Sequence, residues 1–582
     1  MAFGTTLTLT GEQMSLPKRP LTASAAAAGL AALIATSGVA TAAPAQPALT
    51  LEALGTHATG IFDASAAEIP AFDPSTNQLF VVNAQSGAVD VLTLDGEGVP
   101  AHTGSLPAVG RAAADGSVVA EGAVVNSVSV SRGVLAVAVE HSDKVEHGWT
   151  LFFRTSDLGY LGGVRVGSLP DSLKFSPDGR FVVVANEGEP ADDFSSDPEG
   201  TISVITVPAS PIQFGRLSQG AVRTVDFRAY DDGTELPDGV RVFGPDVAAP
   251  EGHAEAGYVA RNLEPEFVTI AGNGNTAFVS LQEANAVAVV DLKSATLSSL
   301  WALGYVDWSV DGELDASDRD GAINRQHWPV KGVLMPDGIA TYTYRGSDLV
   351  VTANEGDARE WGDFVDGDRL KDKQFVLCEE EFPNAGELKR DESLGRYNVI
   401  SDLGFDAERG CYSELYSYGG RGFAIFTADG ERLFNSGDMV ERAIADLIEA
   451  GELPEDAFNA NHSEQGSFDK RSDDKGAEPE DVQIGHLQGR TYAFLGLERI
   501  GGVMVFDITD PRDAHYVTYV NNRDFSVSYD EDEPEGFAAA GDLGAEGMAF
   551  IPASESPTHT PLLVVANEVS GTTTVWEISL KR

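Results

Sequence analysis

Short apolar runs alternate with Gly-rich turns along most of this chain, and the stretch from Glu478 to Ile508 shows this pattern most completely. Its segments DVQIG, TYAFLGLE and GGVMVFDI are apolar or alternate polar with apolar residues, and HLQGR and RIGG provide the turns. A period of two, β-branched and aromatic residues, and Gly-rich turns predict strands. Three strands with short turns form an antiparallel meander, which cannot bury both faces alone. The pattern therefore predicts further copies.

Six other segments repeat this arrangement, with an acidic residue or Asn near the start and an apolar second strand that often ends in Asn or Glu. They start at Glu68, Asn126, Pro170, Glu264, Pro336 and Ala545. Successive starts lie between 44 residues (126 to 170) and 142 residues (336 to 478) apart. The shorter intervals suit a four-stranded blade, and the longer ones suit a blade with a loop insertion. We therefore predict an all-β fold, a single seven-bladed β-propeller, with six or eight blades as the alternatives.

The propeller domain is predicted over residues 43–582 as one unit. A lone strand within residues 49–60 precedes the first repeat, and its pairing with the last repeat would close the ring and leave no open edge. Within the insertions, apolar residues three and four apart predict one packing helix from Met439 to Ala450. The insertions are expected at about 208–262, 301–335, 356–418, 428–477 and 525–544.

One insertion carries a weak calcium-loop signal. Asp315, Ser317, Asp318 and Asp320 are spaced like cation ligands, but Gly321 falls one place late for an EF-hand. The expectation at this point is a hydrated turn.

Residues 1–42 have the features of a signal peptide. Lys18 and Arg19 precede an Ala-rich apolar run, and Ala40-Thr41-Ala42 offers a small-residue cleavage pattern. A membrane anchor is the alternative, but the run is rich in Ala, Ser, Thr and Gly. No other stretch approaches the ~18 apolar residues of a membrane-spanning helix. We therefore expect an exported protein, secreted or periplasmic, without a stable membrane anchor.

Composition narrows the classes of partner. The 90 acidic residues against 39 Lys and Arg give a formal charge of −51, which repels nucleic acid and anionic membranes and favours cations. A solvated acidic surface is the alternative interpretation of this charge.

The two cysteines, Cys378 and Cys411, lie in the 356–418 insertion, and export makes a disulfide the expectation. Two free thiols are the alternative in a reducing compartment.

The acidic residues at the repeat starts are the candidate metal ligands. The first strand of each blade lines the central channel of a propeller, so these carboxylates should converge near one mouth. Carboxylates brought together repel one another unless protons, basic residues or cations compensate, and oxygen ligands suit Ca²⁺ or Mg²⁺. Some of them could instead cap turns or pair with arginines. The candidates are Glu68, Asp171, Glu264, Glu266, Asp337, Glu478, Glu480 and Glu546.

A second polar series ends the middle strands, at Asn186 to Glu189, Asn354 to Asp357, Glu498-Arg499 and Asn567-Glu568. Such residues often satisfy backbone groups of the following turn, and they would also form a polar rim around the channel mouth. Four basic residues in the same motifs, together with a bound cation, could hold a phosphate or carboxylate. They are Arg359, Arg421, Lys475 and Arg499, and each could equally be an ion-pair partner.

Long motifs connect the chain with a known family. ANEGEPADDFSSDPEGTISVI, MPDGIATY, VTANEGDARE, RSDDKGAEPE, LERIGGVMVFDITDP and VVANEVSGTTTVWEI closely resemble the choice-of-anchor I family. The resemblance implies a β-propeller at or outside the cell surface; the family includes bacterial exported proteins and sea-urchin mesenchyme-specific cell-surface glycoproteins. The resemblance implies no set of catalytic residues that could be assigned to positions in this sequence. The usual Gln-Glu-Asn-Asn run reads Gln282-Glu283-Ala284-Asn285 here, and no sorting motif follows the last strand, which favours release.

The leading functional hypothesis is an exported propeller that binds a divalent cation, Ca²⁺, and presents loops to an extracellular ligand or partner. A monomer is expected. The alternative is a metal-dependent phosphomonoesterase, similar to alkaline phosphatase or phytase, that uses carboxylates at the channel mouth. The chain contains no G-x-S-x-G, P-loop or H-E-x-x-H motif. Metal-assisted hydrolysis by carboxylates has no short sequence signature, so the hydrolase stays open.

Overall fold

The computed structural model describes residues 48–250, 256–361, 364–530 and 536–581. The predicted signal peptide, residues 1–42, lies outside the described residues, as do short parts of three predicted insertions. The described chain is all-β in character, with many four-stranded antiparallel sheets and a β-propeller-like fold. No helix in this part of the chain is long and apolar enough to span a membrane.

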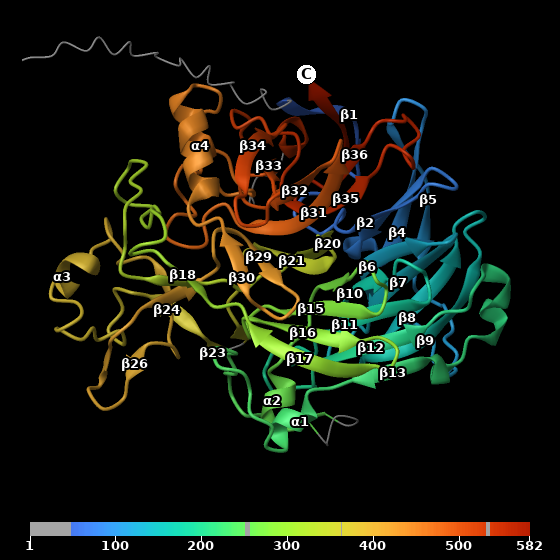
Figure 1. Ribbon diagram of the computed structural model, residues 1–582, viewed down its shortest axis with the longest axis horizontal. Coiled ribbons are helices and arrows are strands. Elements are labelled where there is room, and N and C mark those ends of the chain that lie inside the picture. Colours follow the sequence, from blue (N-terminus) through green and yellow to red (C-terminus); the bar gives the residue numbers. More distant parts are fainter. Residues whose placement is uncertain (1–47, 251–255, 362–363, 531–535, 582) are drawn as a thin grey trace, which may run out of the picture. The chain divides into compact units, whose positions relative to one another are not determined.

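Seven four-stranded antiparallel sheets occur within the described residues (Figure 1). The first consists of β2 (Pro70–Asp73), β3 (Gln78–Asn83), β4 (Ala88–Leu94) and β5 (Pro100–Pro107). The second consists of β6 (Val124–Ser131), β7 (Val134–Glu140), β8 (His147–Arg154) and β9 (Tyr160–Ser168). The third consists of β10 (Pro170–Phe175), β11 (Phe181–Asn186), β12 (Thr201–Thr206) and β13 (Val222–Val225). The fourth is β14 (Val268–Ile270), β15 (Thr276–Leu281), β16 (Ala286–Asp291) and β17 (Thr296–Ala302).

The remaining three sheets include the interrupted fifth repeat. It consists of β20 (Ile339–Tyr344), β21 (Ser347–Asn354), β29 (Gly422–Thr427) and β30 (Arg432–Asn435). The sixth is β31 (Pro479–Leu487), β32 (Arg490–Leu497), β33 (Val503–Asp507) and β34 (His515–Val520). The last has the order β1 (Ala48–Ala58), β37 (Thr572–Lys581), β36 (Leu562–Asn567), β35 (Ala545–Ile551).

Each predicted repeat start lies at the beginning of one of these sheets. The first strands of the sheets contact one another in chain order, namely β2 with β6, β6 with β10, β10 with β14, β14 with β20, β20 with β31, β31 with β35, and β35 with β2. The lone N-terminal strand pairs as expected, because β1 runs antiparallel to β37 from Ala48↔Lys581 to Ala58↔Thr572.

The apolar cores lie between neighbouring sheets. Phe423 of β29 packs on Phe506 of β33, with ring centroids 4.7 Å apart, so the fifth and sixth sheets share one core. Leu135 and Val137 of β7 share a second core with Phe80 and Val91 of the first sheet. Because both faces of the middle strands are covered, these strands are apolar throughout rather than alternating. Burial of each such large side chain stabilises the fold by roughly 1.5–3 kcal/mol.

The insertions carry the rest of the secondary structure. β18 (Tyr305–Asp307), β19 (Lys331–Val333) and β28 (Tyr416–Tyr418) form a three-stranded sheet that joins two insertions. Three two-stranded ribbons pair β22 (Glu360–Trp361) with β23 (Phe364–Val365), β24 (Gly367–Arg369) with β25 (Asn398–Ile400), and β26 (Phe405–Asp406) with β27 (Cys411–Tyr412). The helices are α1 (Arg228–Asp231), α2 (Tyr258–Arg261), α3 (Ala385–Leu388) and α4 (Met439–Glu449), and short 3₁₀ turns cover Ala84–Ser86, Pro211–Arg216, Gln219–Ala221, Glu455–Ala457 and Phe537–Ala539.

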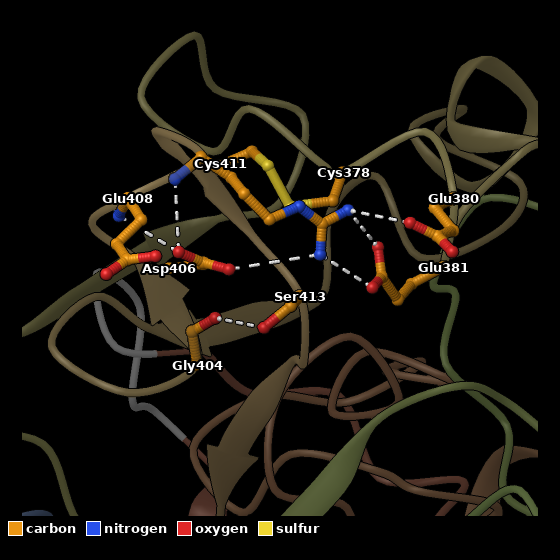
Figure 2. Close-up of a disulfide and its surroundings, with 9 residues drawn as sticks. Cys378, Glu380, Glu381, Gly404, Asp406, Glu408, Cys411 and Ser413 are labelled. Carbon is orange, nitrogen blue, oxygen red and sulfur yellow. Dashed lines mark hydrogen bonds and ion pairs between the residues drawn. A yellow bond between two sulfur atoms is a disulfide. The ribbon is translucent and has the colours of Figure 1, made fainter.

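Two insertion features follow the sequence closely. α4 coincides with the predicted packing helix and buries Val440, Ala443 and Ile444. Cys378 and Cys411 form a disulfide with Cα atoms 5.2 Å apart, beside an ion pair between Arg409 and Glu381 (Figure 2). The disulfide joins β27 to the segment that precedes α3, so it holds the outer part of the insertion together.

Candidate metal centre at one end of the sheets

Acidic residues at the starts of the first strands come together at one end of the sheets. Asp171, Glu480 and Glu546 lie on β10, β31 and β35, and Glu68 and Asp337 lie two residues before β2 and β20. Glu68, Asp171, Asp337 and Glu546, from four different sheets, line one cavity of about 280 Å³. The convergence of these four predicted ligands is therefore present.

Residues that directly follow the second strands lie at the same end of the sheets. Because first and second strands are antiparallel, the end of one lies beside the start of the other. The backbone N–H groups of Glu187, Glu498 and Glu568 donate to the carbonyls of Leu169, Glu478 and Gly544 over 2.8–2.9 Å. These residues belong to the second polar series of the sequence. They place a second set of carboxylates next to the first.

The two series together make compact groups of oxygen ligands. Three such groups form, and in each group one carboxylate oxygen per residue lies within 4.8 Å of the others. Glu480 belongs to two groups and connects them. The groups are Glu187 with Glu266 and Glu283, Asp337 with Glu480 and Glu546, and Glu355 with Glu480 and Glu498.

Several carboxylate oxygens in these groups are buried without a partner. Glu266, Glu283 and Glu480 are only 7%, 6% and 7% exposed, and the Oε2 atom of each accepts no hydrogen bond. Leaving a buried polar atom unpaired costs roughly 1–3 kcal/mol, and more for a charge. A proton or a cation among the oxygens would remove this penalty.

Burial and like charge shift the titration of these groups. Burial raises the pKa of Glu480 well above its usual value, and the nearby Glu355 and Glu546 act in the same direction. Burial, together with Glu283, likewise raises the pKa of Glu266. The pKa of Glu355 rises to about 8 through burial, although Lys475 opposes the shift. Carboxyl groups of this kind either hold protons or bind a cation.

Glu478 behaves differently from the other predicted ligands. Its fully buried carboxylate pairs with Arg471 at 2.5 Å, Lys475 at 3.1 Å and Arg499 at 3.0 Å. Although burial acts to raise it, these three cations hold the pKa of Glu478 well below its usual range. We therefore assign Glu478 to charge pairing rather than to metal binding.

Glu264 is also paired with a basic residue. Its carboxylate forms a buried ion pair with Arg359, and Arg359 also donates to Asn262 over 2.6 Å. Arg421, another predicted anion ligand, is buried and pairs with Glu441 at 3.0 Å. It also donates hydrogen bonds to three backbone carbonyls and lies over the ring of Tyr397. Arg359 and Arg421 therefore support the architecture and are not directed at a ligand.

The other two basic residues face a cavity, which is called the mouth cavity below. Lys475 and Arg499 line this space of about 430 Å³ together with Arg471 and Glu283. Lys475 also forms an ion pair with Glu355, a member of one carboxylate group. The cavity therefore places positive charge directly beside carboxylates that could hold a cation.

His462 is a site residue that the sequence did not single out. Arg499 donates to its Nε2 over 2.6 Å, and its Nδ1 lies 3.2 Å from Glu498. Burial, with Arg499 nearby, lowers the pKa of His462 to about 2, so the ring is neutral. An isolated N-H-S-E segment in an irregular insertion offers no signal of this placement. Glu187, Glu355 and Glu498 were expected at the rim, but not as ligands. Glu283 appeared in the sequence only within the Gln282-Glu283-Ala284-Asn285 run.

Comparison with known proteins places this architecture in a family. Residues 68–511 match the model of the choice-of-anchor I domain. The chain belongs to the choice-of-anchor I family. This family match confirms the resemblance seen in the motifs, and it includes the first six of the seven repeat starts.

Two relatives of the family match only in part. Gigasin-3a of Magallana gigas is 27% identical over 192 residues, which is 33% of this chain and 66% of that protein. The mesenchyme-specific cell surface glycoprotein of Strongylocentrotus purpuratus is 28% identical over 280 residues, which is 43% of this chain and 35% of that protein. The chain thus spans about two thirds of the first relative and about a third of the second.

The solved structures that match this chain are more distant in sequence. Hydrazine synthase of Kuenenia stuttgartiensis has a TM-score of 0.42 and 13% identity, over 90% of this chain and 100% of that one. The WD40 domain of Pan2 from Neurospora crassa has a TM-score of 0.39 and 10% identity, over 90% of this chain and 95% of that one.

Proposed function

We propose that this member of the choice-of-anchor I family is an exported seven-bladed β-propeller that binds Ca²⁺ in its central channel and presents its loops to an extracellular ligand. The observation that carries the proposal is the meeting of three carboxylate groups from several sheets, with buried oxygens that have no partner. Extracellular residence is supported by the family and by the name of one relative, a cell surface glycoprotein.

The seven-bladed ring rests on three observations. Seven sheets have four strands each within the described residues, their first strands contact in chain order, and β35 contacts β2. β1 supplies the outermost strand of the seventh sheet by pairing with β37. Deletion of residues 49–57 should therefore lower the melting temperature of the whole domain in one cooperative transition, and an unchanged melting temperature would contradict the closure.

The carboxylate groups suit Ca²⁺ better than a softer metal. Ca²⁺ takes six to eight oxygen ligands in flexible geometry, whereas Zn²⁺ prefers nitrogen and sulfur. Asp337, Glu480 and Glu546 supply three carboxylates from three adjacent first strands, and Glu187, Glu266 and Glu283 supply another three. We assign these two groups as the cation positions. Glu355 and Glu498 extend the first group through Glu480.

Metal analysis of the exported protein tests the proposal directly. Purified without chelator, the protein should contain calcium, and after chelator treatment it should take up Ca²⁺ in an isothermal titration. Glu266→Gln and Glu480→Gln should each weaken one binding event by roughly 10-fold or more, since ligand-sphere changes cost 10- to 100-fold in affinity. A protein that binds no Ca²⁺ after chelator treatment would overturn the proposal.

The mouth cavity supports a second candidate, a metal-dependent phosphomonoesterase. Arg471, Lys475 and Arg499 line the same space as Glu283, so a phosphate could contact basic side chains and a cation at once. Hydrolysis of p-nitrophenyl phosphate should then disappear with chelator and return with Ca²⁺. Calcium binding without such hydrolysis would leave the binding protein as the function and remove the hydrolase.

The remaining expectations concern the whole molecule. We propose that residues 1–42 are removed on export, that the mature protein is a monomer, and that its partner is an extracellular molecule rather than nucleic acid. The N-terminal sequence of secreted protein and its mass by light scattering test the first two points. Retention of residues 1–42 or a stable dimer would contradict them.

A further inference from the structure

Two insertions meet at a set of three aspartates that shares no residue with the channel groups. Asp315 and Asp320 lie in the loop between β18 and β19, and Asp469 lies in the irregular segment that follows α4. One carboxylate oxygen of each residue lies within 4.8 Å of the others. The three residues are thus spaced as the oxygen ligands of one cation would be.

The loop that carries the first two aspartates is wrapped around their carboxylates. Asp315 accepts from the backbone N–H groups of Ser317, over 3.2 Å, and of Asn324. Asp320 accepts from the backbone N–H of Ala322 over 3.1 Å and from the Asn324 amide over 2.8 Å. These bonds orient both carboxylates and close the loop, but they do not neutralise either charge.

Asp469 provides the observation that points to a ligand. The residue is only 2% exposed, and its Oδ1 accepts a hydrogen bond from the Ser472 hydroxyl over 2.5 Å. Its Oδ2 is buried and has no hydrogen-bond partner. A buried carboxylate with an unpaired oxygen is costly unless it is protonated, paired or bound to a metal.

Basic residues do not neutralise this cluster. Among the described residues, no Lys, Arg or His forms an ion pair with Asp315, Asp320 or Asp469. Arg421 directs its guanidinium to the carbonyl of Asp315 at 3.0 Å and to the carboxylate of Glu441. Burial, with Asp315 nearby, raises the pKa of Asp469 to about 8.

We propose that Asp315, Asp320 and Asp469 bind a Ca²⁺ ion that joins the 301–335 insertion to the 428–477 insertion. This site does not depend on the channel cation of the proposed function, with which it shares no residue. The displaced Gly321 excludes an EF-hand, but it does not prevent the loop from supplying two carboxylates while the third comes from the other insertion. The loop predicted to be a hydrated turn would then be a cation-binding loop, and its third carboxylate ligand would come from the other insertion.

The position of this ion has a consequence for the channel mouth. Arg471 and Lys475 follow Asp469 by two and six residues, and both pair with Glu478. Arg421 also holds the carbonyls of Ser472 and Asp474, each over 2.7 Å. A cation at Asp469 would therefore order the segment that delivers two basic side chains to the mouth cavity.

Terbium luminescence distinguishes this site from the channel. Tb³⁺ replaces Ca²⁺ at oxygen sites and emits when a nearby indole is excited. Trp328 donates its Nε1–H to the carbonyl of Leu314 over 3.1 Å, directly beside Asp315. We expect chelator-treated full-length protein to give Tb³⁺ emission that falls in Trp328→Phe and that Ca²⁺ displaces.

Four variants complete the test. Asp469→Asn and the half-buried Asp320→Asn should each weaken the Trp328-dependent Tb³⁺ signal by roughly 10-fold or more in apparent affinity. Glu480→Gln, in the channel, and Asp429→Asn, at an exposed turn, should leave that signal unchanged. Circular dichroism in chelator identifies any variant that fails to fold. If Asp469→Asn does not fold, the Tb³⁺ affinity of Asp320→Asn decides the test. Parent-like Tb³⁺ affinity in folded Asp469→Asn or Asp320→Asn would overturn the proposal, whatever the channel does.

Discussion

Asp337 and Glu480, at the starts of the first strands of two neighbouring sheets, direct carboxylate oxygens to within 4.8 Å of each other. Two like charges this close destabilise the fold unless a proton or a cation lies between them. Burial and neighbouring carboxylates raise the pKa of Glu480 well above its usual value. The stability of the domain should therefore depend on Ca²⁺ and on pH, and the dependence should be traceable to single residues.

Glu480→Gln keeps the shape of the side chain and removes one charge. In the parent protein, Ca²⁺ at a hundredfold excess over the dissociation constant of the site that contains Glu480 should add about 2.7 kcal/mol to the free energy of unfolding through that site. A tenfold loss of affinity would reduce this increment to about 1.4 kcal/mol at the same Ca²⁺ concentration. Denaturant unfolding with and without Ca²⁺ measures both values. The exposed Glu97→Gln should keep the full increment, and an equal increment in Glu480→Gln would contradict the assignment.

Glu478→Gln should lower stability independently of Ca²⁺, although Glu478 is only two residues away from Glu480. The neutral amide would leave Arg471, Lys475 and Arg499 without their shared buried partner. Removing one member of a buried ion pair costs roughly 3–5 kcal/mol, and the loss should be as large in chelator as in Ca²⁺. Glu431→Gln, at an exposed ion pair with Arg512, should change stability by less than about 1 kcal/mol. A loss in Glu478→Gln as small as that of the surface variant would contradict the role.

The pH dependence of stability should differ with and without Ca²⁺. Burial raises the pKa of Glu68 and of Glu355 to about 8, from 4.5 in the unfolded chain. The folded state therefore binds more protons at these two groups, and their contribution to stability in chelator should be fully present below about pH 4.5 and be lost as pH rises through about 8. Ca²⁺ requires the ionised form, so its stabilising effect should grow over the same window. Melting temperatures at pH 5 to 9 test this, and a Ca²⁺ effect independent of pH would contradict it.

Leu49→Ala tests the attachment of the N-terminal strand. Leu49 is 3% exposed and packs in one core with Trp576 of β37 and Phe494 of the sixth sheet. Truncation of such a buried leucine costs roughly 2–5 kcal/mol. Thr50→Ala, at the next and half-buried position of β1, is the matched control and should cost less than about 1 kcal/mol. Equal stability of the two variants in denaturant unfolding would mean that β1 is not part of the packed core.

Removal of the disulfide should loosen the 356–418 insertion. Cys378 and Cys411 are 33 residues apart, and closing such a loop stabilises the folded state by about 3–4 kcal/mol in the chain-entropy model. The Cys378→Ser/Cys411→Ser double variant should be cleaved faster by protease within this insertion, and reducing agent should have no further effect on it. Two titratable thiols in native exported protein would contradict the bridge.

The sequence predicted the repeated sheets because strand signals are local. Alternation, β-branched residues and Gly-rich turns report the backbone conformation of a few neighbouring residues, and each repeat start found this way begins a sheet. The same regularity brought Glu68, Asp171, Asp337 and Glu546 to one cavity. α4 was also predicted, since its apolar face follows the helical period.

Sequence reasoning treated Glu478 and Glu480 alike, and only the tertiary structure separates them. Glu478 precedes β31 with a φ of 53°, so strand alternation does not set the direction of its side chain. It meets Arg471 and Lys475 from the 428–477 insertion, whereas Glu480 meets Asp337 from another sheet.

The sequence by itself therefore determined the strand repeats and the placement of carboxylates at strand ends. The tertiary structure decided which carboxylates are neutralised by basic residues and which have no basic partner. The physical reason is the difference in the range of the two interactions along the sequence. Backbone conformation depends on residues nearby in the sequence, whereas a charge is compensated by any group that the fold brings within a few ångströms. Glu264 and Arg359, 95 residues apart, and Asp315 and Asp469, 154 residues apart, are pairs that no local pattern could connect.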